Sequence, residues 1–126
     1  MSRIKHIAIR TPDVEQTASF YMDVFELTEA GKGRNGVYLT DGHINLAILK
    51  VQDAGPNAGK TGIDHFGFQV EDMDEAASKL ETVGAEALAV HTPPPSADGQ
   101  SYYEAKYFDP VGQVVDVTHT GWVGAQ

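Results

Sequence analysis

Two histidines stand at equivalent places in the two halves of this 126-residue chain, and both have the side chain of a metal ligand. His6 lies in the stretch 4–10, and His65 lies in the similar stretch 63–69. Alternate side chains of a β-strand point to opposite faces, so each histidine shares a face with small and polar residues while isoleucines or phenylalanines occupy the other. A sheet built this way can bring two nitrogen ligands together.

The final strand expected in each half adds one more polar residue of this kind. Asn45 and Asp116 each alternate with aliphatic neighbours. If the polar faces converge, these two residues meet His6 and His65. Two imidazoles and a carboxylate can bind a divalent first-row metal and leave positions open for water and substrate. Asn45 would add a weak carbonyl ligand, or hydrogen-bond a bound water or substrate.

Other polar side chains are candidates for contact with substrate. Arg10 and Gln69 lie on the same face as the histidines, where they can contact an oxygenated substrate. His43 follows a turn and is expected at the rim, and Lys106 is a weaker candidate. Arg10 and Lys106 together indicate an anionic group, which a carboxylate, a phosphate or a thioester carrier would supply equally well.

These residues are embedded in an internal repeat. At a constant offset of 59 residues, His6 matches His65, and the residues around them match in order. After a longer loop in the second half the offset grows to 71, where Asn45 matches Asp116. Each half therefore predicts the order strand–helix–strand–strand–strand.

The expected elements follow from periodicity, caps and turns. Asp13 and Asp72 each begin a helix, with Gln16 or Glu75 completing a capping box three residues on. The strands are expected over about residues 4–10, 27–32, 37–40, 44–51, 63–70, 85–91, 102–108 and 113–118. Residues 109–112 join the last two strands, and a long loop over residues 91–101 is expected beside the mouth of the site.

Composition limits the classes of function. The length suits one domain over residues 1–126, with modules at about 3–51 and 63–119 and a linker over 52–62. A formal net charge of −9 argues against a nucleic-acid or anionic-membrane partner. The chain has no cysteine, which excludes disulfides and thiolate ligands. No signal peptide precedes the first strand pattern, so a cytoplasmic location is expected.

The most specific motifs are Ile-Lys-His-Ile at 4–7, Phe-Tyr at 20–21, Ile-Asp-His-Phe at 63–66 and Tyr-Phe-Asp-Pro-Val-Gly at 107–112. Over nearly the whole chain, the sequence resembles the vicinal-oxygen-chelate superfamily of glyoxalase I, methylmalonyl-CoA epimerase, type I extradiol dioxygenases and the fosfomycin and bleomycin resistance proteins. The resemblance implies an α+β fold in which two βαβββ modules form a curled mixed sheet, a cup around the metal, with the helices on its outer face. It also implies a homodimer.

The resemblance assigns roles residue by residue. His6 and His65 fall on the family's two histidine ligands, and Asp116 falls on its carboxylate ligand, which is usually Glu. Asn45 stands where glyoxalase I has a ligating, catalytic Glu, so glyoxalase I activity is not expected. The histidine–histidine–carboxylate set is closer to the iron triad of extradiol dioxygenases, but those enzymes are usually longer and have a Tyr where this chain has Lys106.

Three functions stay open on this basis. The first is a divalent-metal-dependent lyase or isomerase that binds a small, vicinally oxygenated substrate and stabilises an enediolate or oxyanion, with Asp116 and Asn45 as candidate catalytic residues. The second is an extradiol ring-cleaving dioxygenase with a His-His-Asp Fe(II) site. The third is a metal-free drug- or metabolite-binding protein. The donor set does not distinguish Fe, Mn, Zn, Co and Ni.

Overall fold

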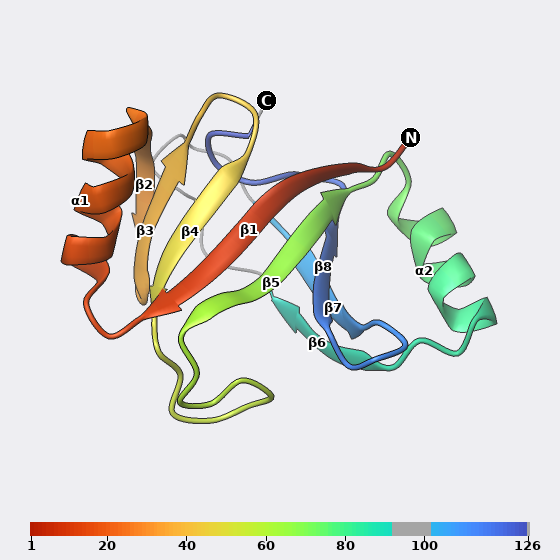
Figure 1. Ribbon diagram of the computed structural model, residues 1–126. Helices are drawn as coiled ribbons and strands as arrows, with labels where there is room; N and C mark the ends of the chain where they lie inside the picture. Colours follow the sequence, from red (N-terminus) through yellow and green to blue (C-terminus); the bar gives the residue numbers. More distant parts are fainter. Residues whose placement is uncertain (92–101, 126) are drawn as a thin grey trace. The chain divides into compact units, whose positions relative to one another are not determined.

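The computed structural model describes residues 1–91 and 102–125, so the predicted loop after His91 lies outside the described residues. Its elements in chain order are β1 (Arg3–Thr11), α1 (Val14–Phe25), β2 (Thr28–Gly33), β3 (Gly36–Thr40), β4 (Asn45–Lys50), β5 (Gly62–Gln69), α2 (Met73–Thr82), β6 (Ala87–His91), β7 (Glu104–Phe108) and β8 (Val114–Thr118) (Figure 1). Each half has the order β–α–β–β–β, which confirms the α+β prediction of two βαβββ modules. Neither helix in the described part of the chain is long and apolar enough to cross a membrane.

The chain divides into two compact units whose boundaries fall inside β1 and β5. The first-module unit comprises His6–Asp64 and the C-terminal segment Trp122–Gln126. The second-module unit comprises His65–Gly121 and the N-terminal segment Met1–Lys5. The first-module unit therefore includes the C-terminal segment of the chain, and the second-module unit includes the N-terminal segment.

In the first-module unit the strand order is β2-β3-β4-β1, with β1 parallel to β4 and the other pairs antiparallel. The register places His6 beside Asn45 and Asn45 beside Thr40, so these three residues form one polar row. The two-faced pattern predicted for these strands is therefore present in this unit.

The opposite face of this unit packs against α1. Asp13 caps the helix, because its carboxylate accepts a hydrogen bond from the Gln16 N–H at 3.0 Å. Ala18 of α1 is buried together with Leu39 and Ile48 of the strands. Partly buried side chains surround this cluster: Ile9, Val14, Tyr21, Met22, Leu27, Val37 and Leu46. The apolar side of α1 is therefore closed against its sheet.

In the second-module unit the strand order is β5-β8-β7-β6, with β5 parallel to β8. Gly67, Asp116 and Lys106 form a row on the polar face. The neighbouring row on the opposite face holds Phe66, Val115 and Tyr107.

The second helix starts like the first but packs differently. Asp72 accepts a hydrogen bond from the Glu75 N–H at 3.0 Å, which matches the cap of α1. No residue of α2 is buried, and Val83 just after it is 78% exposed. The apolar side of α2 is therefore not closed against its sheet in the way that α1 is.

Candidate functional site

His65 and Asp116 lie side by side on the polar face of the second-module unit. His65 comes from β5 and Asp116 from the adjacent parallel strand β8, next to Gly67 in the register. Nε2 of His65 is 3.2 Å from Oδ2 of Asp116, and the side chains are 5% and 0% exposed. Gly67 carries no side chain between them, so the imidazole and the carboxylate can approach. A buried pair of this kind is more typical of a site than of a solvated strand end.

Lys106 holds the other oxygen of the same carboxylate. It comes from β7, directly opposite Asp116 in the antiparallel register. Its ammonium lies 2.8 Å from Oδ1 of Asp116 and 3.7 Å from a carboxylate oxygen of Glu104. One oxygen of Asp116 therefore faces a lysine and the other faces His65. The sequence suggested Lys106 as a substrate contact, and its observed partners are carboxylates.

The geometry of this pair fits two ligands of one metal ion. Atoms that are both bound at about 2.1 Å lie about 3.0–3.4 Å apart when the ligand–metal–ligand angle is between octahedral and tetrahedral values. The separation of 3.2 Å between Nε2 of His65 and Oδ2 of Asp116 lies in that range. Imidazole nitrogen and carboxylate oxygen are both ligands of divalent first-row metals. His65 and Asp116 can therefore hold a metal without rearrangement of their own positions.

His6 is oriented by an amide in the first-module unit. Nδ2 of Asn45 donates to the carbonyl oxygen of Val123 at 2.8 Å, so Oδ1 of Asn45 points the other way. That oxygen lies 2.7 Å from Nδ1 of His6 and can only accept. Nδ1 of a neutral His6 thus carries the proton, and Nε2 carries the lone pair that a metal ligand needs. A hydrogen bond of this kind on the other nitrogen is the usual arrangement for a ligating histidine.

The C-terminal segment covers this face of the first-module unit. Trp122 stacks on the imidazole of His6, with ring centroids 4.7 Å apart and planes 7° from parallel. The backbone oxygen of Gly124 accepts a hydrogen bond from Thr40 at 2.7 Å. A Cβ on Gly124 would lie 2.7 Å from that of Ala30, so the close approach needs glycine here. Sequence reasoning gave Trp122 no role, and a lone tryptophan outside any periodic pattern offered no signal for one.

Arg10 and Gln69 are on the expected faces and are engaged by their own units. Nη1 of Arg10 donates to the carbonyl oxygen of Lys50 at 3.0 Å, and its Nε lies 3.9 Å from the carboxylate of Asp64. Nε2 of Gln69 donates to the carbonyl oxygen of His119 at 3.3 Å. Both side chains thus have protein partners, and their role toward a substrate stays a prediction.

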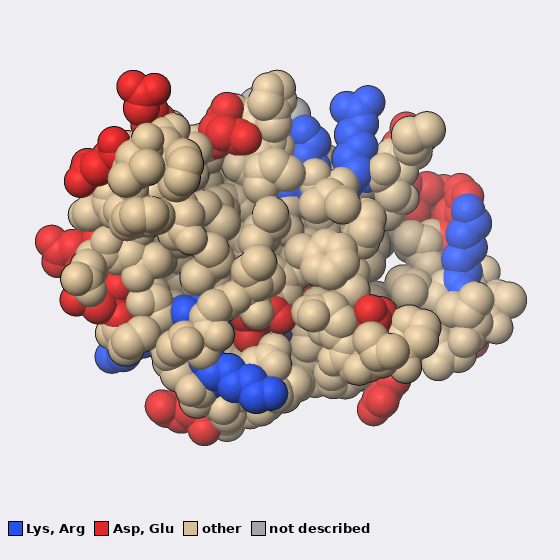
Figure 2. All heavy atoms as spheres, in the orientation of Figure 1, with Lys and Arg blue, Asp and Glu red and all other residues tan. Residues whose placement is uncertain are grey.

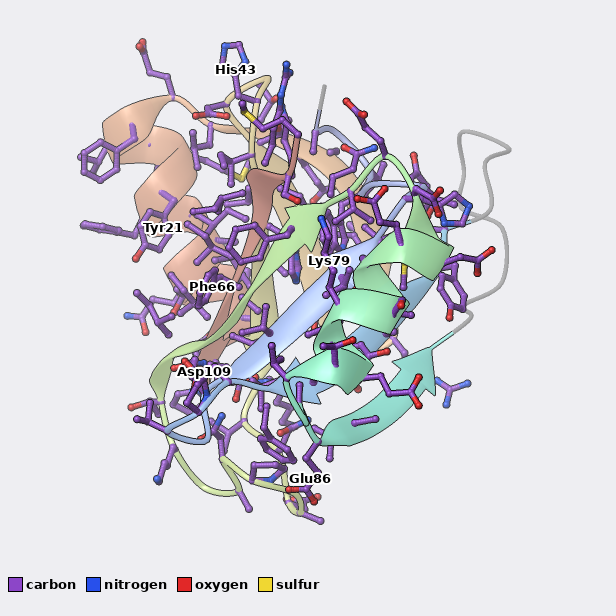
Figure 3. All side chains as sticks on the ribbon, turned by 90° about the vertical axis from the view of Figure 1, so that its right-hand side faces the viewer. Tyr21, His43, Phe66, Lys79, Glu86 and Asp109 are labelled. Carbon is purple, nitrogen blue, oxygen red and sulfur yellow. The ribbon has the colours of Figure 1, made fainter. Side chains whose placement is uncertain are left out.

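His43 is exposed at the turn between β3 and β4 (Figure 3). Asp41 forms this turn, because its carboxylate accepts the N–H groups of Ile44 and His43 at 2.8 Å each. These hydrogen bonds hold the pKa of Asp41 below its ordinary value. The support that Asp41 gives to the turn is therefore complete above its ordinary pKa and is lost as the pH falls through the lowered one.

Three comparisons with known proteins bear on this site. A sequence model described as the Glyoxalase/Bleomycin resistance protein/Dioxygenase superfamily matches residues 3–117. The trivalent organoarsenical cleaving enzyme of Thermomonospora curvata is 32% identical over 94 residues, which are 67% of this chain and 56% of that protein. The chain thus spans only about half the length of this relative.

Two further similarities cover more of this chain than the organoarsenical cleaving enzyme does. The ethylmalonyl-CoA/methylmalonyl-CoA epimerase of Cereibacter sphaeroides is 26% identical over 113 residues, which are 79% of this chain and 84% of that protein. The crystal structure of the Mn(II)-bound glyoxalase from Novosphingobium aromaticivorans superposes with a TM-score of 0.72 at 19% identity, covering 100% of this chain and 42% of that one. At that identity the superposition establishes the shared fold.

Proposed function

Because the chain belongs to the Glyoxalase/Bleomycin resistance protein/Dioxygenase superfamily, we propose that it is a metal-dependent enzyme in which His6, His65 and Asp116 bind one divalent metal ion. The observation that carries the proposal is the buried contact of His65 with Asp116 at the spacing of two metal ligands. The sequence repeat places His6 at the position equivalent to His65, and its Asn45 hydrogen bond leaves Nε2 as the basic nitrogen. All three residues are buried.

The other residues would support this donor set. Asn45 fixes the tautomer and orientation of His6, and Trp122 covers one face of the same ring. Lys106 contacts Oδ1 of Asp116 and so leaves Oδ2 toward the metal, although its positive charge would also oppose that of the ion. The amide of Asn45 has no basic nitrogen, so Asn45 is a positioning residue in this proposal and does not serve as a general base.

The reaction we propose is of the lyase or isomerase type on a small, vicinally oxygenated substrate. When bound, a divalent metal supplies Lewis-acid stabilisation for the negative charge of an enediolate or oxyanion. The activities for which the two relatives are named, epimerisation of acyl-CoA esters and cleavage of organoarsenicals, support a small-molecule substrate for this chain. If Asp116 is a metal ligand, it cannot also serve as the general base, so another group would transfer the proton.

One observation favours a different function. Lys106 pairs with Oδ1 of Asp116 and neutralises part of the charge of this carboxylate. A buried carboxylate paired in this way is stable in a metal-free protein, as a drug- or metabolite-binding member would require. The two functions differ in metal content, which can be measured directly.

The test is metal analysis of protein produced without a histidine tag, followed by a panel of substrates. We expect about one Mn, Fe, Co, Ni or Zn ion per chain after incubation with each metal and desalting. The loaded protein is then assayed for hydrogen exchange into methylmalonyl-CoA and for cleavage of a trivalent organoarsenical. Protein loaded with Fe(II) under anaerobic conditions is also assayed for ring cleavage of a catechol. Methylglyoxal with glutathione should give negligible turnover, because Asn45 replaces a carboxylate. If the protein retains only trace amounts of each of the five metals, the metalloenzyme proposal is wrong and the metal-free binding function is favoured.

We also propose a homodimer. β2 and β6 each stand at one end of the strand order, and an end strand offers unpaired backbone groups that a second copy can cover. Light scattering at high micromolar concentration should give twice the chain mass of 13.6 kDa. The mass of a single chain at that concentration would contradict the proposal.

A further inference from the structure

The second-module unit contains a large cavity between α2 and its sheet. Its volume is about 1150 Å³, slightly above the range of about 300–1000 Å³ found for small-molecule pockets. It lies on the face of the sheet opposite to Asp116, because Val115 and Val117 line it and flank Asp116 on the same strand. The space-filling view shows an opening beside α2 (Figure 2).

The walls of this cavity are apolar on both sides. Ala76 and Leu80 line it from α2, one helical turn apart. Phe68, Val115 and Val117 line it from β5 and β8. In the first-module unit the equivalent apolar surfaces are in contact through Ala18, which is a closed core. An apolar ligand in this cavity would remove these side chains from contact with solvent, which is favourable.

The rim of the cavity is acidic. Five acidic residues line it, against Lys79 and the N-terminal ammonium of Met1: Glu71, Asp72, Glu75, Glu86 and Asp109. The lysine is already paired with Glu75 at 2.9 Å, and the N-terminal ammonium pairs with Glu71 at 2.9 Å and lowers the pKa of Glu71. Within the described residues the Glu86 carboxylate has no ion-pair partner, and Figure 3 shows it on the segment that follows α2.

We propose that this cavity binds an amphiphilic cation, with an apolar chain or ring between α2 and the sheet and an ammonium group beside Glu86. The apolar walls select for the body of the ligand, and the excess of carboxylates at the rim selects for a positive end group. An anionic amphiphile of the same length would contact the same apolar walls, but its charged group would be repelled by the carboxylates at the rim. This site is separate from the proposed metal site, because the two lie on opposite faces of β5 and β8.

The test compares decyltrimethylammonium with decanoate, both far below the concentrations at which they form micelles. Titration calorimetry on the wild-type chain should show the cation binding about tenfold or more tightly than the anion. NMR of the wild type should show contacts from the decyl chain to the methyl groups of Val115 and Val117. Equal binding of the two probes would overturn the charge assignment, and contacts located elsewhere would overturn the cavity.

Two variants and one matched control complete the test. Glu86→Gln should weaken binding of the cation about three- to tenfold without affecting decanoate, whereas Glu81→Gln on α2, outside the lining, should change neither. Ala76→Trp places an indole ring between α2 and the sheet and should weaken binding of the cation while the circular dichroism of the chain stays unchanged. Should this variant fail to fold, the NMR contacts of the wild type decide. Binding that disappears when the protein is concentrated would show a second copy in the cavity and overturn the proposal.

Discussion

Replacing His65 with alanine should reduce the affinity of the protein for divalent metal by at least about a hundredfold. The imidazole lies 3.2 Å from Oδ2 of Asp116 and supplies one of three proposed ligands. The fold should survive the change, because Asp116 keeps its ion pair with Lys106 and Ala fits the small-residue pattern of this face. Competition against a chromophoric chelator measures the affinity, and circular dichroism measures the fold.

His43→Ala is the matched control for this experiment. It removes the same imidazole from an exposed turn, so metal affinity and fold should both match the wild type. His6→Ala should behave like His65→Ala, because the repeat makes the two histidines equivalent. Full metal affinity in both His6→Ala and His65→Ala would show that the metal binds elsewhere in the chain.

Much of the local structure was predictable because it depends on patterns that span few residues. The two caps are an example: Asp13 and Asp72 each accept a hydrogen bond from the N–H group three residues on, as the capping-box spacing predicts. The alternation around Asn45 and Asp116 likewise gave the correct polar face, because side-chain direction in a strand follows from sequence parity alone.

The pairing of Lys106 with Asp116 was not predictable, because it depends on the length of one turn. The sequence placed the turn at residues 109–112, which would set Phe108 opposite Gln113. In the structure Asp109 binds the N–H of Gln113 with its side chain, the turn gains a residue, and Phe108 pairs with Val114. A shift of one residue changes which side chains share a face. Only the longer turn puts the lysine beside the aspartate.

The different packing of the two helices could also not be predicted from the sequence pattern. Both helices carry apolar residues at helical spacing, but only α1 has a buried residue among them. α1 presents Val14, Tyr21 and Met22 to its sheet. α2 offers Ala76 and Leu80 with few large side chains between them, which leaves the space below it unfilled. Periodicity reports the direction of a stripe, whereas closure depends on the volume of the residues within it.

Lys106→Met should lower the free energy of unfolding of the metal-free protein by about 2–4 kcal/mol, because it leaves the buried carboxylate of Asp116 without its ammonium partner. Methionine keeps most of the apolar stem, so the loss reports the charge more than the packing. A divalent cation at Oδ2 would replace the missing positive charge. Metal should therefore stabilise the variant more than the wild type, and bind the variant about tenfold more tightly. Urea unfolding with Mn²⁺ and with a chelator measures both quantities.

Lys79→Met is the control, since the ion pair of Lys79 with Glu75 is exposed and should contribute less than about 1 kcal/mol, with no dependence on metal.

The Lys106 experiment also separates the two proposed functions. A metalloenzyme recovers stability in Lys106→Met when metal is added, because the ion and the ammonium act on the same carboxylate. A metal-free binding protein loses the same stability with and without metal. If metal stabilises the wild type and Lys106→Met equally, Lys106 does not oppose the metal. If metal stabilises neither protein, Asp116 is not a metal ligand.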